Sequence, residues 1–210
     1  MKKLLLIFSF AFLLASCEKG KFEKTISSDS DPTDTWKPVD SATAMKAYMD
    51  YATVGAMHKL LSKYDGNWMG ETTMWMSEDA APVKSMIECT NKMIYGGRYQ
   101  ISEFKGSMMG APFEGLSQTG YDNAKKKFVS NWIDNMGTGM MYAEGDWDAS
   151  KKLIEFKGKM SDVTRPGKTC DVREVFTFVD DNNQLLEMYG PGPKTGKEMK
   201  TMEIKFTRKK

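Results

Sequence analysis

The sequence predicts an all-β fold, an antiparallel meander of about ten strands closed into a barrel, with one N-terminal amphipathic helix capping it. Three features lead to this prediction. Residues 65–210 alternate between strand-like runs and turn signals, residues 41–64 carry a helical period, and no later helix is long enough for parallel crossovers. One open sheet of so many strands would expose two edges and strain against its own twist, so closure is favoured.

The first 16 residues have the features of a secretory signal peptide. A positive head at Lys2 and Lys3 precedes an apolar run over residues 4–14. A membrane-spanning helix needs roughly 20 apolar residues, and this run is about half as long. Residues 1–16 are therefore expected to be removed during export.

The residues Leu14-Ala15-Ser16-Cys17 resemble the bacterial lipobox. The resemblance implies that the Cys17 sulfur receives a diacylglyceryl group and that the new amino terminus is acylated too. Several acyl chains hold a protein on a membrane more firmly than one, at ~0.8 kcal/mol per buried CH₂. Membrane lipid is thus the expected partner of Cys17, in an exported lipoprotein of the cell envelope. Glu18 differs from the Asp that retains some lipoproteins at the inner membrane, which by analogy favours the outer membrane.

Residues 17–40 are predicted to form a flexible tether between the lipid and the globular domain. The stretch over residues 27–34 is rich in Ser and Asp and poor in apolar side chains, so it cannot contribute to a core. The tether would let the domain stand clear of the lipid headgroups.

Between residues 41 and 64, apolar residues recur at steps of three or four, the period of one helix face. They are Met45, Tyr48, Met49, Ala52, Ala56, Met57, Leu60, Leu61 and Tyr64. Asp40 or Ser41 can cap the start of this helix, and its apolar stripe is expected to lie on the β domain. His58, the one histidine of the chain, has no metal-ligating or acid-base partners near it in sequence, so a structural role is expected.

Ten strands are predicted after the turn at residues 65 and 66. They run over residues 68–76, 83–94, 98–105, 113–121, 127–135, 140–147, 152–160, 169–179, 184–189 and 198–207. Short clusters of Gly, Asp, Asn, Pro and Ser separate them, which is typical of an antiparallel meander.

Composition argues against nucleic acid as a partner. Removal of the signal peptide takes away Lys2 and Lys3 from the 30 basic residues, which leaves them balanced by the 28 acidic ones. Cys89 and Cys170 remain after lipidation, in a compartment that permits disulfides. They could pair if their Cα atoms lay within about 7 Å, but two buried free thiols are the expected state.

Specific motifs spread over the globular part carry a resemblance to a known family. They include Gly66-Asn67-Trp68-Met69-Gly70, Gly96-Gly97-Arg98-Tyr99, Pro112-Phe113-Glu114-Gly115-Leu116, Trp132-Ile133-Asp134-Asn135-Met136-Gly137 and Glu187-Met188-Tyr189-Gly190. The stretch over residues 58–210 resembles the bacterial family named domain of unknown function 1579. The resemblance implies a calycin-like, lipocalin-like barrel in which the tryptophan of Gly66-x-Trp68 plugs the closed end. It implies no activity.

Polar residues within strands are the candidate ligand-binding residues: Arg98, Trp132, Asp134, Arg173, Glu187 and Tyr189. Period two places Trp132 with Asp134, and Glu187 with Tyr189, on shared faces. It also places Arg173 with Asp171 on one face of residues 169–179, and Glu174 with Val172, Phe176 and Phe178 on the other. If these faces line the lumen, Arg98 or Arg173 could pair with a ligand carboxylate while Trp132 and Tyr189 bury its apolar body. The competing account is that the charged residues pair across the sheet.

Three functions follow from this pattern. The first is binding of a small apolar or amphipathic molecule in the barrel, favoured by 18 methionines and many aromatic residues. The second is a filled barrel that serves as a structural or interaction module of the envelope.

The third function is a hydrolase or isomerase that uses Asp134 with Glu187 or Glu203. Linear enzyme motifs are missing from the sequence, so a non-enzymatic role is favoured over this one. No cofactor and no metal are expected, and copper held by methionine sulfur is the remaining metal alternative.

Overall fold

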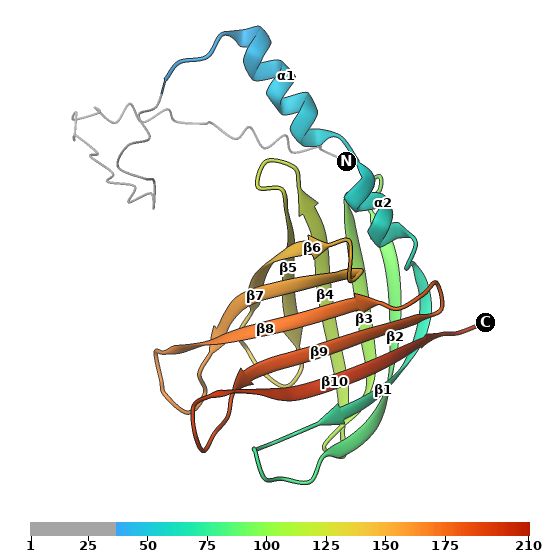
Figure 1. The fold of residues 1–210 in the computed structure, drawn as a ribbon, viewed down its shortest axis with the longest axis vertical. Helices are drawn as coiled ribbons and strands as arrows, with labels where there is room; N and C mark the ends of the chain where they lie inside the picture. The colour runs from blue at the N-terminus through green and yellow to red at the C-terminus, as the bar shows by residue number, and fades with distance from the viewer. Residues whose placement is uncertain (1–36) are drawn as a thin grey trace, which may run out of the picture. The chain divides into compact units, whose positions relative to one another are not determined.

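The computed structural model describes residues 37–210. The predicted signal peptide, Cys17 and most of the tether lie outside the described residues. Within them, ten strands form one closed antiparallel barrel (Figure 1), which confirms the predicted fold class. Residues 40–210 form a single compact unit.

Within residues 37–210, two short helices precede the strands. The helices are α1 (Ser41–Ala52) and α2 (Ala56–Ser62). The strands are β1 (Gly66–Met74), β2 (Val83–Ile94), β3 (Tyr99–Met108), β4 (Ala111–Asp122), β5 (Lys127–Asp134), β6 (Met141–Asp148), β7 (Leu153–Ser161), β8 (Thr169–Phe178), β9 (Asn183–Pro191) and β10 (Glu198–Arg208).

The barrel closes because the first and last strands pair with each other. Every strand from β1 to β10 is antiparallel to the next in sequence, and β1 pairs with β10 with Trp68 opposite Arg208. The register between β9 and β10 shifts once, between Lys200 and Met202. A simple meander therefore leaves no edge strand in this barrel.

The ten predicted strands all exist, and the largest difference in their bounds is at the β3–β4 hairpin. Residues 106–112 are predicted to connect the two strands, whereas β3 continues to Met108 and β4 begins at Ala111. Met109 and Gly110 form a two-residue turn, both at positive φ (51° and 82°), as a tight hairpin with matching twist requires. A methionine at positive φ is uncommon, so Met109 did not indicate a turn at this position.

The single helix predicted over residues 41–64 is wrong in one respect, because the chain leaves the helix at Thr53. Thr53 has an extended ψ of 127°, and α2 begins after Gly55. β-branched Thr53 and Val54 followed by glycine form a weak helical segment. The Thr53 hydroxyl also donates to the Met49 carbonyl (2.7 Å), which ends α1.

The barrel holds the C-terminal end of α1 through two turns. The Asn123 amide in the β4–β5 turn donates to the carbonyls of Tyr51 (2.9 Å) and Thr53 (2.7 Å). Arg98, in the β2–β3 turn, donates to the Ala52 carbonyl (2.8 Å). These donors satisfy carbonyls that a helix end leaves without partners.

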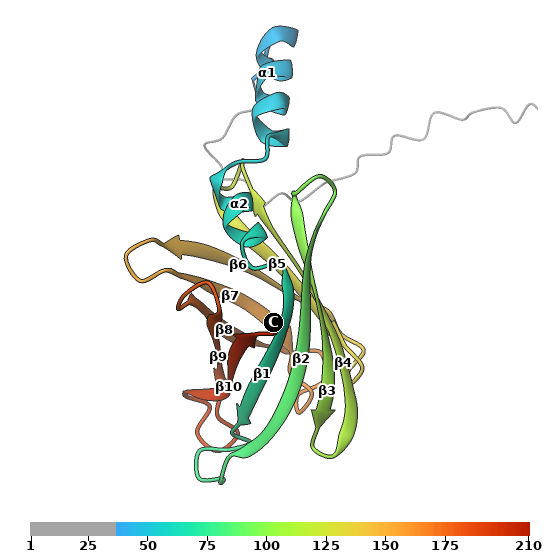
Figure 2. The ribbon, with the colours of Figure 1, turned by 90° about the vertical axis from the view of Figure 1, so that its right-hand side faces the viewer.

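The predicted packing of the α1 stripe on the β domain is also wrong. Met45, Tyr48 and Met49 are 58–66% exposed, and α1 extends away from the end of the barrel that α2 covers (Figures 1 and 2). The break at Thr53 turns α1 away, so the buried residues of the stripe, Leu61 and Tyr64, come after the break. No helix in residues 37–210 combines the length and the apolar content that crossing a bilayer requires.

Helix α2 and Trp68 close one end of the barrel. Trp68 is fully buried, its indole N–H donates to the Tyr64 carbonyl (3.0 Å), and Arg208 lies 4.2 Å above its ring. Arg208 also donates to the carbonyls of Lys63 (2.8 Å) and Asp65 (2.6 Å). The tryptophan of Gly66-x-Trp68 thus plugs this end, as the family resemblance implied.

Glycine at position 158 allows β7 to approach β6 closely. A Cβ there would lie 2.4 Å from the Tyr142 carbonyl oxygen, which is backbone and cannot move aside cheaply. We expect Gly158→Ala to lower the free energy of unfolding by about 1–3 kcal/mol, measured by urea titration. Gly190→Ala is the matched control, since its new methyl would meet Thr201 at an ordinary 3.7 Å. Equal effects of the two substitutions would contradict this explanation.

Candidate ligand-binding site

The interior of the barrel contains two adjoining cavities. The deep cavity, about 90 Å³, lies at the α2 end beside Tyr64 and Trp68. The outer cavity, about 140 Å³, lies farther along the strands beside Trp132 and Met108. Phe104, Glu174 and Leu186 line both cavities, and we call these three residues the neck.

Period-two alternation on four strands positions the lining residues. On β8 the side chains of Glu174, Phe176 and Phe178 point inward, and on β9 those of Gln184, Leu186 and Met188 do. Ser130 and Trp132 on β5, and Gln100, Ser102 and Phe104 on β3, line the facing wall. The register of β8 with β7 and β9 sets Glu174 between Phe156 and Met188.

Glu174 at the neck is a carboxyl group without a partner among the described residues. Phe156, Met188, Phe104 and Leu186 surround it, so the accessible part of its side chain faces the two cavities. Burial raises the pKa of Glu174 to about 7, since removal from water disfavours the charged carboxylate. The group is therefore poised between its neutral and charged forms near neutral pH.

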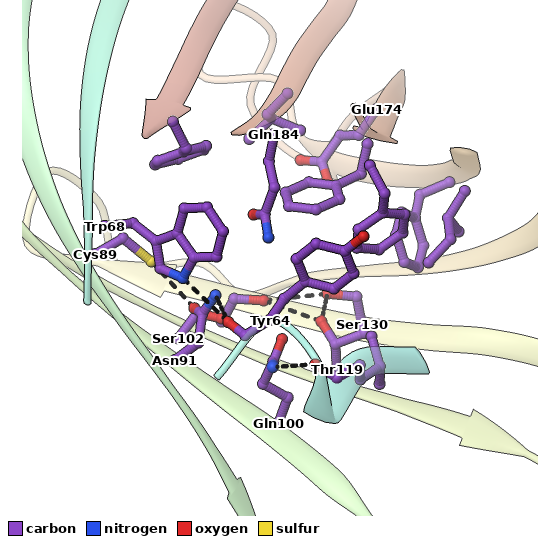
Figure 3. A pocket seen from close by; sticks show the side chains of 18 of the residues that line it. Tyr64, Trp68, Cys89, Asn91, Gln100, Ser102, Thr119, Ser130, Glu174 and Gln184 are labelled. Atoms are coloured by element: carbon purple, nitrogen blue, oxygen red, sulfur yellow. Dashed lines mark hydrogen bonds between the residues drawn. The ribbon is translucent and has the colours of Figure 1, made fainter. Parts of the chain in front are cut away.

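Other polar groups line the cavities without using all their hydrogen-bonding capacity. Ser117, Thr119 and Ser130 form a hydroxyl cluster with oxygen–oxygen distances of 3.2–3.4 Å. Among residues 37–210, the Gln184 amide nitrogen and the Thr72 hydroxyl are buried without a hydrogen-bond partner. In Figure 3, Glu174 and Gln184 point into the deep cavity from one side, and Thr119 and Ser130 from the other.

Two side-chain amides hold the floor of the deep cavity. The Asn91 amide donates to the Tyr64 carbonyl (3.0 Å), and the Gln100 amide donates to the Leu61 carbonyl (2.8 Å). Burial raises the pKa of Cys89 to about 12, so this thiol stays protonated. Cys89 and Cys170 are both free, as expected, although only Cys89 is buried.

Comparison with known proteins places this barrel in a family. The model of a family described as a protein of unknown function, DUF1579, matches residues 53–208. The chain belongs to the DUF1579 family. The match covers all ten strands, and it confirms the resemblance seen in the sequence motifs. No curated protein matches this sequence.

Two solved structures share the fold of this DUF1579 protein. Rv2717c from M. tuberculosis superposes with a TM-score of 0.55 at 10% identity, over 75% of this chain and 100% of that one. The S-type phycobiliprotein lyase CPES from Guillardia theta superposes with a TM-score of 0.51 at 6% identity, over 78% of this chain and 97% of that one. At such identities the likeness concerns the fold alone.

Two of the six predicted ligand-binding residues lie inside the DUF1579 barrel. Trp132 and Asp134 line the outer cavity, where the indole N–H donates to the Asp134 carboxylate (2.6 Å). The backbone N–H groups of Met136 (2.9 Å) and Gly137 (3.1 Å) also donate to Asp134. This carboxylate therefore accepts three hydrogen bonds, and it fixes the orientation of Trp132.

Three of the other predicted residues lie together on the outer face of the barrel. Arg173 makes two hydrogen bonds to Glu198 (2.9 and 2.7 Å) and its guanidinium lies 3.9 Å above the Tyr189 ring. The Tyr189 hydroxyl donates to Glu187 (3.2 Å). Arg173 thus pairs with residues of other strands, and Glu187 pairs with Lys200 of β10, as the competing account expects. Arg98, the sixth residue, holds α1 and lines neither cavity.

The carboxylate pairs considered for catalysis are not assembled. Lys200 bridges Glu187 and Glu203 on the outer face, with Glu203 at 2.9 Å, whereas Asp134 lies inside. Burial opposes the charge of Lys200, but its hydrogen bonds to the two glutamates prevail and raise its pKa.

His58 has a structural position between α2 and the barrel. It is 4% exposed, and its Nδ1 accepts a hydrogen bond from the Gly55 N–H (3.1 Å) at the start of α2. Burial lowers the pKa of His58 and so favours the neutral imidazole. Within the described residues, no three His, Cys, Asp or Glu side chains gather as a metal site would require.

Sequence reasoning missed Glu174, the central polar group of the site. The signal was present, because a glutamate stands in an otherwise apolar alternation with Val172, Phe176 and Phe178. A charged residue on an apolar face of a strand marks either an outer face or a buried functional group. The predicted binding residue on β8 was instead Arg173, its neighbour on the opposite face.

Proposed function

We propose that this DUF1579 protein binds a small, largely apolar molecule inside the barrel, across the deep cavity, the neck and the outer cavity. The observation that carries the proposal is the set of unpartnered polar groups around these cavities: Glu174, Gln184 and Thr72. A buried polar group without a partner costs about 1–3 kcal/mol. A barrel shaped for stability alone would carry apolar residues at these positions, so a ligand that satisfies the groups accounts for them.

The cavity sizes indicate the size of the ligand. A cavity of about 150 Å³ lined by apolar side chains holds benzene, whereas drug-sized ligands occupy roughly 300–1,000 Å³. The deep and outer cavities, about 90 and 140 Å³, each suit a group no larger than a single ring. A longer molecule would need Phe104 and Leu186 to move apart at the neck.

Methionines provide a route into the outer cavity. Met108, Met136, Met188 and Met202 line it, and Met136 is 46% exposed, so it lies at the surface end. Unbranched methionine side chains change rotamer easily and adapt to differently shaped apolar groups. This arrangement supports entry at the end of the barrel opposite Trp68.

Filling the neck tests the binding proposal. The full-length chain, purified from cells that make it naturally, is expected to carry a reproducible small molecule in native mass spectrometry. Leu186→Trp should lose that molecule because the indole occupies the neck. Leu185→Trp, one residue away and facing outward, should keep it. A bare protein that also takes up nothing from an extract of lipids and metabolites would contradict the proposal and favour the filled-barrel module.

We also propose that Cys17 carries a lipid that anchors the protein to a membrane. The lipobox-like residues before Cys17 support this proposal. In cells fed an alkyne-tagged fatty acid, we expect the chain to incorporate the tag and to sediment with membranes. Cys17→Ser should abolish both properties, whereas Cys170→Ser should change neither. Labelling that survives Cys17→Ser would refute the assignment.

A further inference from the structure

We infer that the ligand of this barrel carries a basic nitrogen, held as a cation against the Glu174 carboxylate at the neck. This inference rests on the proposed function and names the chemical class of its ligand. Three features of the described residues support it: the charges in the lumen, the unequal bonding of its two carboxylates, and the aromatic rings beside Glu174.

The lumen holds negative side chains and no positive one. No Lys, Arg or His among the described residues lines the deep or the outer cavity, whereas Glu174 and Asp134 do. A carboxylate or phosphate ligand would meet like charges in a water-poor space, where repulsion is strong. The sequence predicted that Arg98 or Arg173 would pair with a ligand carboxylate. The charges in the lumen instead favour a ligand with a positive charge.

Of the two carboxylates, Glu174 is the one with capacity to spare. Asp134 already accepts three hydrogen bonds, from the Trp132 indole and two backbone N–H groups. Glu174 has apolar neighbours and no donor among the described residues, and it borders both cavities. A cation that reaches the neck from either cavity would meet a carboxylate with all its acceptor sites free.

Aromatic rings complete a site suited to an amine with an apolar body. Phe104, Phe156 and Phe176 line the space around Glu174, and ring faces attract cations where water is excluded. Beyond them, Trp132 and Phe113 stack at 6.3 Å between centroids in the outer cavity and offer a flat apolar surface. Phe178 and Tyr64, whose ring centroids lie 4.4 Å apart with the planes tilted by 35°, form an apolar surface in the deep cavity.

Three probes of equal size and different charge test the inference: benzylamine, benzyl alcohol and benzoate. Each would be titrated at about pH 8, where the amine is a cation, into full-length protein with ¹³C-labelled methionine methyl groups. Signals of Met108, Met188 and Met202 report on the outer cavity, and those of the exposed Met45 and Met49 serve as internal controls. Thr119 and Ser130 carry no charge, so the hydroxyl cluster alone would not favour benzylamine over benzyl alcohol.

We expect benzylamine to bind roughly tenfold to a hundredfold more tightly than benzyl alcohol, the ratio of a charge-assisted to a neutral hydrogen bond, and benzoate to bind most weakly. Glu174→Gln should remove the preference for the amine and leave the alcohol affinity within about twofold. Glu103→Gln is the matched control, because Glu103 is exposed on the outer face of β3, and it should keep the wild-type order.

The outcomes separate this inference from the proposed function. If all three probes shift the cavity methionines with similar affinity, the barrel binds ligands but the basic nitrogen is refuted. If benzoate binds best, the polarity assigned to the lumen is wrong. If no probe shifts these methionines and no molecule accompanies the purified protein, both proposals fail together.

Discussion

Glu174→Gln is expected to raise the stability of the protein relative to wild type by about 3 kcal/mol more at pH 8 than at pH 4. The pKa of Glu174 is about 7 in the folded protein and 4.5 for an ordinary glutamate. Between these values the folded state holds a proton that the unfolded state has released, so wild-type stability falls as the pH rises. Above about pH 7, the folded protein carries a buried charge that the glutamine variant lacks.

Urea unfolding of the ligand-free protein at pH 4, 6 and 8 measures this effect. The difference between Glu174→Gln and wild type should be small at the lowest pH and grow steadily to the highest. Glu103→Gln, which removes an exposed carboxyl from β3, should follow the wild-type curve throughout. Parallel curves for Glu174→Gln and wild type would show that the carboxyl ionises freely, and the site would lose its buried acid.

Trp68→Ala is expected to lower the free energy of unfolding by about 3–5 kcal/mol. Trp68 has no exposed surface, donates to the Tyr64 carbonyl and lies beneath the Arg208 guanidinium. Truncation would leave a cavity next to the deep cavity and release the contact that joins β1, β10 and the α2 end of the barrel. The loss should therefore exceed that of any single exposed aromatic residue.

A short series of variants checks the role of Trp68. Trp68→Phe keeps an apolar ring and loses the N–H donor, so its effect should be intermediate, while Asn91 still donates to the Tyr64 carbonyl. Tyr48→Ala is the control, because Tyr48 on α1 is 66% exposed, and it should change stability by less than about 0.5 kcal/mol. If Trp68→Ala costs no more than Tyr48→Ala, the plug is not a principal element of stability.

Alternation and turn signals were enough to predict the strands and their order, because both are local properties of the chain. Closure of the barrel is not local, and it was predicted from the two edges that an open sheet of ten strands would expose. The fate of the helix depended on tertiary contacts. Carbonyl acceptors at the end of α1 meet donors from Arg98 and Asn123, two residues in distant turns. An apolar stripe such as that of Met45 and Met49 indicates a helix face but not the surface that will cover it.

The candidate site was predicted in part, for a reason set by strand geometry. Period two assigns residues to faces, but it does not say which face is inside. Trp132 and Asp134 lie on the inner face of β5, as a binding role requires. On β8 the predicted binding residue, Arg173, lies on the outer face, and its neighbour Glu174 lies on the inner one. Adjacent residues of one strand thus have different roles: Arg173 forms an ion pair on the outer face, and Glu174 is the central polar group of the lumen.

The closure of β1 on β10 sets the order in which this protein can assemble. Each hairpin of the meander can form as soon as its two strands exist, but Arg208 meets the carbonyl of Asp65 only across 143 residues of chain. Bringing such distant segments together has the highest entropic cost of any step in the fold. A chain in which β1 and β10 have not yet paired would expose the unpaired backbone groups of both edge strands, which could then pair with another chain. Arg208 contacts Asp181 on one side of the β1–β10 junction and Asp65 on the other, so it stabilises the closed barrel.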